Sequence, residues 1–173
     1  MNINDMIQES KIMTGPFPDF DKRSYENPLL HFKEWFKDAI NSEVKEPTSV
    51  VVSTYDKERI TDSRVMIIKA MDDQGFFIET NKERAKVDQI AYNQHVAINI
   101  YWREQGRQIR IQGIADSTAN FDHVEDYLDA KTRDLMVYKI IPSRVEFYQA
   151  KNQGGYERLL YTLKENQWQN KWL

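Results

Sequence analysis

Residues 63–69, with the sequence SRVMIIK, constrain the fold of this chain more than any other stretch. They form an apolar run of strand-forming residues, with Arg64 near its start and Lys69 at its end. Turn-forming residues stand on both sides, at 56–59 and at 72–75. Because strands joined by such short turns pair antiparallel, this stretch predicts part of an antiparallel sheet. Two interpretations are open: a core strand with charged ends, or a strand whose charged ends bind a ligand.

The rest of the chain predicts more strands and a few helices. Strands are expected at residues 49–55, 62–70, 76–80, 95–102, 107–113, 144–149, 156–163 and 168–172. Helices are expected from Pro28 to about residue 42, over 83–93 and over 118–131, with a further helical turn at 132–138 that Pro142 ends. Close hairpin succession with few helices predicts a mainly β fold with peripheral helices, a mostly antiparallel barrel or closed sheet.

The chain length and the positions of structure-breaking residues predict one domain preceded by an arm. Residues 1–24 lack clear periodicity and contain the breaker GPFP at 15–18, which predicts an N-terminal arm. Residues 25–173 then suit a single domain with one sizeable core. Asn27 and Pro28 are a favourable cap and first residue for the first helix of this domain, and Thr80 or Asn81 is expected to cap the helix at 83–93.

Composition excludes several classes of function. The net charge of −3 argues against a general nucleic-acid binder, because phosphate neutralisation usually requires a basic excess. The absence of cysteine excludes disulfides, thiol catalysis and cysteine metal sites, and the three histidines are too scattered to predict a metal centre. No apolar run suits a membrane span and the start is not a signal peptide, so we expect a cytoplasmic protein with no membrane partner.

A dispersed set of cations and polar side chains predicts an anion site. Arg64 and Lys69 flank the central strand, and three more cations stand where the next strand passes into a helix: Lys82, Arg84 and Lys86. Together with the Thr80 hydroxyl and a helix N-terminus, they suit a phosphomonoester. Strand 107–113 also carries a row of hydrogen-bonding side chains on one face: Gln108, Arg110 and Gln112. The alternative in both places is a solvated surface.

Seven blocks in one shared order identify a family resemblance. They are NPLLHFKEW (27–35), EPTSVVVST (46–54), SRVMIIK (63–69), FIETN (77–81), RQIRIQG (107–113), VEFYQ (145–149) and RLLYTLKENQW (158–168). Together these blocks resemble the pyridoxine/pyridoxamine 5′-phosphate oxidase family of FMN-binding split-barrel proteins. The resemblance implies an FMN-binding split β-barrel, a homodimer with FMN at its interface, and an FMN-dependent oxidase with a small-molecule substrate.

The resemblance also implies site residues, position by position. The implied cofactor-binding residues are Arg64, Val65, Met66, Ile67, Lys69, Thr80, Arg84, Lys86, Gln108, Tyr148 and Arg158. Thr80 and Lys86 match residues that hold the flavin phosphate, and Tyr148 stands at an aromatic position that is usually tryptophan. The implied substrate-binding residues, at the substrate phosphate, are Lys69, Tyr127 and Lys131. No catalytic residue or metal is implied, because the flavin ring itself carries the redox chemistry.

Several positions depart from the family pattern. The late arginine and histidine that hold the pyridoxal substrate fall on Gly154 and Tyr156, and the serine of the substrate-phosphate site falls on Leu135. One basic residue of the flavin-phosphate motif falls on Ala85, with Arg84 beside it as a substitute. The segment at about 138–142 is also shortened relative to the family. These departures indicate that the flavin side is mostly kept while the vitamin B6 side is eroded.

Three functional hypotheses follow. In the first, the chain transfers a hydride from pyridoxine or pyridoxamine 5′-phosphate to FMN, with reoxidation by oxygen. In the second, a related flavin oxidase or reductase acts on a different small substrate, such as a cyclic amine or a dihydro-aromatic compound of the phenazine-pathway kind. In the third, the chain is a non-catalytic flavin-binding dimer. Retained Lys69, Tyr127 and Lys131 favour the first, while the substitutions at Gly154 and Tyr156 favour the second.

The spacing of Arg64 and Lys69 makes a geometric prediction. On a regular strand, side chains an odd number of residues apart point to opposite faces. Both residues can therefore contact one flavin only if the strand bulges or bends, or if one acts from the end of the strand. We expect an irregularity between Arg64 and Lys69, with FMN lying across it.

Overall fold

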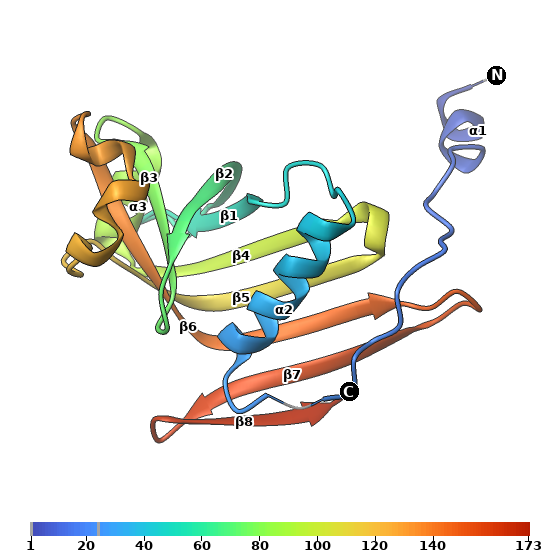
Figure 1. Ribbon diagram of the computed structural model, residues 1–173. Helices are drawn as coiled ribbons and strands as arrows, with labels where there is room; N and C mark the ends of the chain where they lie inside the picture. The colour runs from blue at the N-terminus through green and yellow to red at the C-terminus, as the bar shows by residue number, and fades with distance from the viewer. Residues whose placement is uncertain (1, 24) are drawn as a thin grey trace.

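The computed structural model describes residues 2–23 and 25–173, in which antiparallel strands dominate. The strands are β1 Ser49–Tyr55, β2 Thr61–Met71, β3 Phe76–Asn81, β4 His95–Trp102, β5 Arg107–Asp116, β6 Leu135–Ala150, β7 Tyr156–Lys164 and β8 Gln167–Trp172. Their order in the sheet is β3-β2-β1-β4-β5-β6-β7-β8, and an additional pairing of β3 with β6 closes the first six into a barrel. The strands β7 and β8 extend this sheet as a hairpin outside the barrel (Figure 1). The predicted fold class is confirmed.

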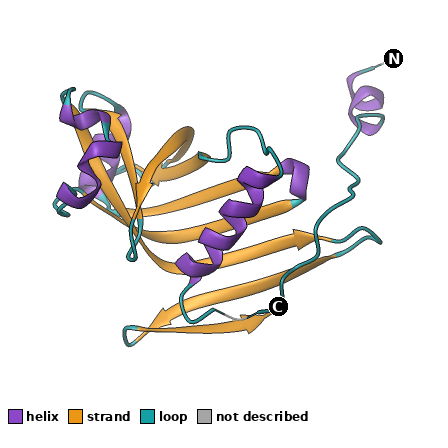
Figure 2. Cartoon of the chain, viewed as in Figure 1, coloured by secondary structure: helices purple, strands orange, loops and turns teal. Residues whose placement is uncertain are grey.

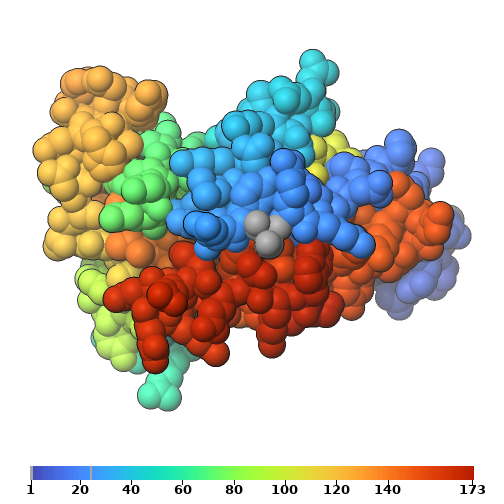
Figure 3. Space-filling view, turned by 60° about the horizontal axis from the view of Figure 1, so that its bottom comes forward, coloured from blue at the N-terminus to red at the C-terminus, as the bar shows by residue number. Residues whose placement is uncertain are grey.

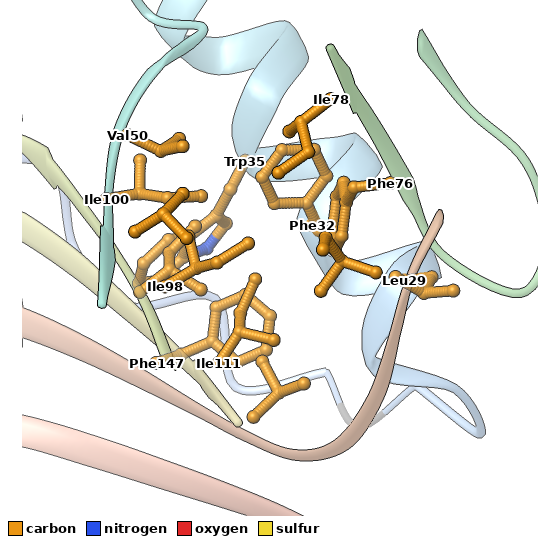
Figure 4. Close-up of a cluster of buried hydrophobic side chains, with 14 of the residues drawn as sticks. Leu29, Phe32, Trp35, Val50, Phe76, Ile78, Ile98, Ile100, Ile111 and Phe147 are labelled. Carbon is orange, nitrogen blue, oxygen red and sulfur yellow. The ribbon is translucent and has the colours of Figure 1, made fainter. Parts of the chain in front are cut away.

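Helices are few and lie around the sheet (Figure 2). The α-helices are α1 Ile3–Gln8, α2 Pro28–Asn41 and α3 Ala85–Tyr92, and the 3₁₀ helices are η1 Arg103–Gln105, η2 Asp122–Tyr127 and η3 Asp129–Lys131. Asn27 caps α2 as predicted, because its side chain accepts a hydrogen bond from the Leu29 amide at 2.8 Å. The helix then buries an aromatic and aliphatic face, including Phe32 and Trp35, among the inward-facing side chains of the barrel (Figure 4).

The N-terminal arm contains one short helix that periodicity did not predict. Figure 1 shows α1 lying well away from the barrel at the end of an extended segment. Closer to α2 the arm is anchored, because Phe20 is buried with its ring 5.1 Å from that of Trp35 and 4.9 Å from that of Trp172. In Figure 3 the late hairpin (red) lies directly against α2 (blue).

Strand β6 is much longer than predicted. The helical turn expected over 132–138 is wrong, since β6 begins at Leu135 and pairs with β3 before it pairs with β7. Pro142 lies inside the strand instead of ending a helix, beside a register shift between Gln112 and Gly113 of β5. Proline donates no ladder hydrogen bond, and a bulge accommodates that loss. Residues 138–142, where the chain is expected to be shorter than the family pattern, lie within this continuous strand.

Two helix predictions need smaller corrections. The helix expected over 118–131 is a pair of short 3₁₀ helices, η2 and η3, with Val124 of η2 and Leu128 between them buried. The helix α3 begins at Ala85 with Arg84 as its N-cap and no side-chain cap, so neither Thr80 nor Asn81 caps it. The Asn81 side chain instead accepts a hydrogen bond from the Glu83 amide at 2.9 Å, within the turn before the helix.

An irregularity is present in β2 at Lys69, the end of the span in which it was predicted. The register between β2 and β3 shifts between Ile68 and Ala70, which places Lys69 at a bulge. Arg64 and Lys69 consequently enter different surroundings. Arg64 contacts β1 and α3, whereas Lys69 contacts η3. The strand therefore carries its two flanking cations to separate parts of the molecule.

Candidate functional site

Four predicted residues gather where α3 begins at one end of the barrel. The Lys86 ammonium donates a hydrogen bond to the Thr80 hydroxyl at 3.2 Å. The Arg64 guanidinium donates to Thr54 Oγ1 at 2.7 Å and to Gln89 Oε1 at 3.0 Å, and it also pairs with Asp62 at 2.6 Å. Strands β1, β2 and β3 thus meet the first turns of α3 at a cluster of donors. We call Arg64, Thr80, Arg84 and Lys86 the basic cluster.

The electrostatics of the basic cluster suit an anion. Partial burial lowers the pKa of Lys86, and the positive charges of Arg64 and Arg84 lower it further. Across residues 2–23 and 25–173, no carboxylate lies within ion-pair distance of Arg84 or Lys86. A bound anion would relieve this repulsion between like charges, and the adjacent helix N-terminus adds a favourable dipole. The charge and hydroxyl donors fit a phosphate group.

Next to Arg64 in the sequence, β2 presents an apolar surface on its opposite face. Val65 and Ile67 are exposed by 67% and 43%, while Met66 between them is buried in the core. The alternation along the strand produces this pattern. Val65 and Ile67 can therefore meet a planar ligand with their side chains, and Met66 can meet it only through its backbone.

A second group of predicted residues forms a row on the outer face of the sheet. Gln108 on β5 is paired in register with Tyr148 on β6, which is paired with Arg158 on β7. The ring of Tyr148 also stacks on that of Tyr156 at 5.1 Å. The structure brings these three side chains together, and we call them the outer row. Because β1 and β4 lie between β2 and β5, the outer row begins about 14 Å from β2 along the sheet.

Glu146 is a residue of this face that sequence reasoning missed. Its side chain is only 2% exposed and accepts hydrogen bonds from Arg158 Nε at 2.9 Å and from Arg144 at 3.3 Å, with Arg110 3.5 Å away. Burial raises the pKa of Glu146, but the hydrogen bond from Arg158 and the nearby arginine charges outweigh it and hold this pKa below its usual range. Strand alternation, which places Glu146 on the face of Tyr148, was the available clue.

The predicted substrate residues lie around η2 and η3, on the outer side of β3. The Lys69 ammonium donates to Asp129 Oδ2 at 2.7 Å and lies 3.9 Å from Glu79 Oε2. Lys131 pairs with Asp126 at 2.6 Å, and Tyr127 is 71% exposed. The structure therefore brings Lys69 to the segment that carries Tyr127 and Lys131, but it pairs each of the two lysines with a carboxylate.

Three further points concern Gly154, metal binding and membrane spans. Gly154 lies in the loop between β6 and β7 with a left-handed backbone, φ +86°, and a side chain there would meet nothing within 4 Å. Within the described ranges, no group of histidine, aspartate and glutamate side chains could hold a metal ion. None of the helices in these ranges has the length and apolar character of a membrane span.

Comparison with known proteins identifies the family of this chain. The family model described as pyridoxamine 5′-phosphate oxidase matches residues 36–151. Among curated relatives, pyridoxine/pyridoxamine 5′-phosphate oxidase 2 of Hydrogenovibrio crunogenus is 28% identical over 183 residues, covering 83% of this chain and 86% of the relative. The pyridoxine/pyridoxamine 5′-phosphate oxidase of Burkholderia thailandensis is 26% identical over 175 residues, covering 79% and 82%.

Solved structures show the same fold. PhzG from Burkholderia lata 383, in complex with tetrahydrophenazine-1-carboxylic acid, matches with a TM-score of 0.78 at 20% identity, covering 92% of this chain and 99% of that one. An FMN-binding protein related to pyridoxamine 5′-phosphate oxidase, from Nostoc punctiforme, matches with a TM-score of 0.68 at 14% identity, covering 88% and 98%. At these identities the likeness establishes the split-barrel architecture alone.

Proposed function

Since the chain belongs to the pyridoxamine 5′-phosphate oxidase family, we propose that it is an FMN-dependent oxidoreductase. The observation that carries this proposal is the basic cluster, in which Arg84 and Lys86 have no carboxylate partner among the described residues. Val65 and Ile67 follow Arg64 along β2 and present an exposed apolar surface on the other face of that strand. A flavin mononucleotide needs this combination, namely cations for its phosphate and an apolar surface for its ring.

Each residue of the site has a binding role in this proposal. Lys86 and Arg64 hold the phosphate by charge-assisted hydrogen bonds, with Arg84 in place of the basic residue that falls on Ala85. Thr80 donates its hydroxyl to the same group, and Val65 and Ile67 support the ring. Bound FMN would supply the hydride-accepting ring and its reoxidation by oxygen. No side-chain acid or base is indispensable to this chemistry in principle, so we name no catalytic residue.

The proposal includes a homodimer with FMN at its interface. Within one protomer, strands β1 and β4 lie between the basic cluster on β2 and the outer row, which begins on β5. The outer face is also suited to burial. It exposes Tyr101, and Asn99 Oδ1 is a buried acceptor with no hydrogen-bond partner among the described residues. A second copy would bring its outer row, Gln108, Tyr148 and Arg158, to the first copy's basic cluster.

Two substrate classes compete within this function. Pyridoxine or pyridoxamine 5′-phosphate is supported by the curated relatives, whose names state that activity. A different small substrate is supported by the side chains themselves, since Lys69 and Lys131 are already paired with Asp129 and Asp126. Release of hydrogen peroxide on addition of pyridoxamine 5′-phosphate to the FMN-loaded protein would favour the first class.

The purified protein tests the cofactor. We expect a yellow protein with an FMN spectrum, and expect Lys86→Ala and Arg64→Ala each to weaken FMN binding by roughly 10- to 150-fold, since a hydrogen bond to a charged group contributes about 1.5–3 kcal/mol. Lys37→Ala is the matched control, because Lys37 pairs with Glu34 on the exposed side of α2. A colourless protein that takes up no added FMN would refute the function. Unchanged affinity in both variants would refute the placement of the phosphate.

A further inference from the structure

The two ends of β2 differ in charge balance. At the Arg64 end, Arg84 and Lys86 lie near Arg64 with no ion-pair partner among the described residues, and Asp62 pairs with Arg64. At the Lys69 end, Lys69 and Lys131 are each paired with a carboxylate of the chain itself, and Arg133 adds a positive charge near Asp129. An anion thus meets unmatched positive charge at one end of β2 and competing negative charge at the other.

Glu79 places a fixed carboxylate at the Lys69 end. Its side chain is 3% exposed and accepts hydrogen bonds from the backbone amides of Asp129 at 3.1 Å and Ala130 at 2.6 Å. These bonds fix η3 against β3 and hold the carboxylate in place. Glu79 Oε2 lies 3.9 Å from the Lys69 ammonium, so one negative charge of this corner cannot swing away.

Asp129 adds a second carboxylate to the same lysine. The Lys69 ammonium donates to Asp129 Oδ2 at 2.7 Å, and this bond holds the pKa of Asp129 below its usual range. Lys131 is matched in the same way by Asp126 at 2.6 Å. A phosphate arriving at Lys69 would have to displace Asp129 and would still face Glu79. The segment that carries these carboxylates, drawn in gold in Figure 1, lies beside β3 and the start of β6.

We propose that this corner selects substrates without a phosphate group, namely uncharged or cationic ring compounds, and disfavours phosphomonoesters. The inference rests on the proposed function, because it concerns the substrate side of the same flavin site. Asp129 and Glu79 are its specificity-determining residues. Asp129 excludes the anion by occupying Lys69, and Glu79 excludes it by charge.

A pair of ligands that differ only in the phosphate tests the proposal. Pyridoxamine and pyridoxamine 5′-phosphate are titrated into the FMN-loaded protein, and binding is followed by the change in flavin absorbance. We expect the wild type to bind pyridoxamine at least as tightly as its phosphate. We expect Asp129→Asn to shift the ratio of affinities toward the phosphate by about tenfold, because it frees Lys69 to bind an anion.

Asp134→Asn is the matched control, since Asp134 is an exposed carboxylate that pairs with Lys82 instead. It should leave the ratio of affinities unchanged. The inference is overturned if the wild type binds pyridoxamine 5′-phosphate more tightly than pyridoxamine. It is also overturned if Asp129→Asn shows no gain in affinity for the phosphate, even where the wild type binds neither ligand detectably. The FMN spectrum recorded before each titration separates this failure from failure of the proposed cofactor.

Discussion

At the scale of single residues, His31 predicts a pH dependence of folding. The ring is fully buried, stacks on Phe147 at 4.1 Å and lies 3.4 Å from the Tyr161 hydroxyl, which can donate to its Nδ1. Burial lowers the pKa of His31 from 6.5 to about 4. The unfolded chain therefore binds this proton more readily, and the stability contributed by neutral His31 is complete above pH 6.5 and lost as the pH falls toward 4.

We expect the free energy of unfolding to decrease by about 1.4 kcal/mol per pH unit across this window on account of His31. Urea denaturation at pH 7.5, 6 and 5 measures the dependence, and His31→Phe should remove that part of the slope. His95→Gln serves as the control, because His95 is exposed at the start of β4. An equal slope of unfolding free energy against pH in the wild type and His31→Phe would show that His31 does not cause this pH dependence.

The residue scale also shows what the sequence could predict of the site. The donors Thr80, Arg84 and Lys86 lie within seven residues of one another, so a strand–helix junction suffices to place them together. Glu146 was missed because two of its three arginine partners, Arg110 and Arg158, come from β5 and β7, and only the register of these strands brings them to it. The carboxylate partners of Lys69 were missed for the same reason, since Asp129 is 60 residues away.

At the scale of elements, the bulge between β5 and β6 predicts a sharp cost for one methyl group. A Cβ on Gly113 would collide with the backbone carbonyl of Ile141, which cannot rotate away as a side chain would. We expect Gly113→Ala to lower the free energy of unfolding by about 2–3 kcal/mol in urea denaturation. Gly154→Ala should cost only about 1 kcal/mol, because it meets no atom and strains only a left-handed backbone. Equal losses would mean that the bulge relaxes.

The packing of β6 on both of its faces explains why this strand was predicted too short. Residues 135–141 are apolar at most positions, and both sides of this stretch are packed. Val137 joins the small cluster with Phe77 and Val124, whereas Ile140 joins the main core. A strand buried on both faces loses its alternation, so periodicity cannot distinguish it from a helix. By contrast, β4 was predicted with its exact bounds, because only one of its faces is buried.

At the scale of the whole molecule, the hairpins were predictable and the closure was not. Short turns fix the pairing of β1 with β2 and of β2 with β3, and each depends on local residues. Closure requires β3 to meet the first half of β6, more than fifty residues later in the chain. Family resemblance implied this barrel, but no local pattern does. The proposed homodimer is harder still to predict from local sequence patterns, because it depends on surfaces that only the closed barrel creates.

Complementation between inactive variants tests that homodimer directly. If each flavin site takes its basic cluster from one protomer and its outer row from the partner, Lys86→Ala and Arg158→Ala damage the same site from opposite sides. In a mixed dimer, one site then contains both substitutions and the other contains neither. We expect separately prepared variants to bind FMN weakly, and expect co-expressed variants to recover one tight site in each mixed dimer. Fluorescence titration with FMN of dimers purified through two different tags measures this recovery, and its absence in verified mixed dimers would mean that one protomer supplies both groups.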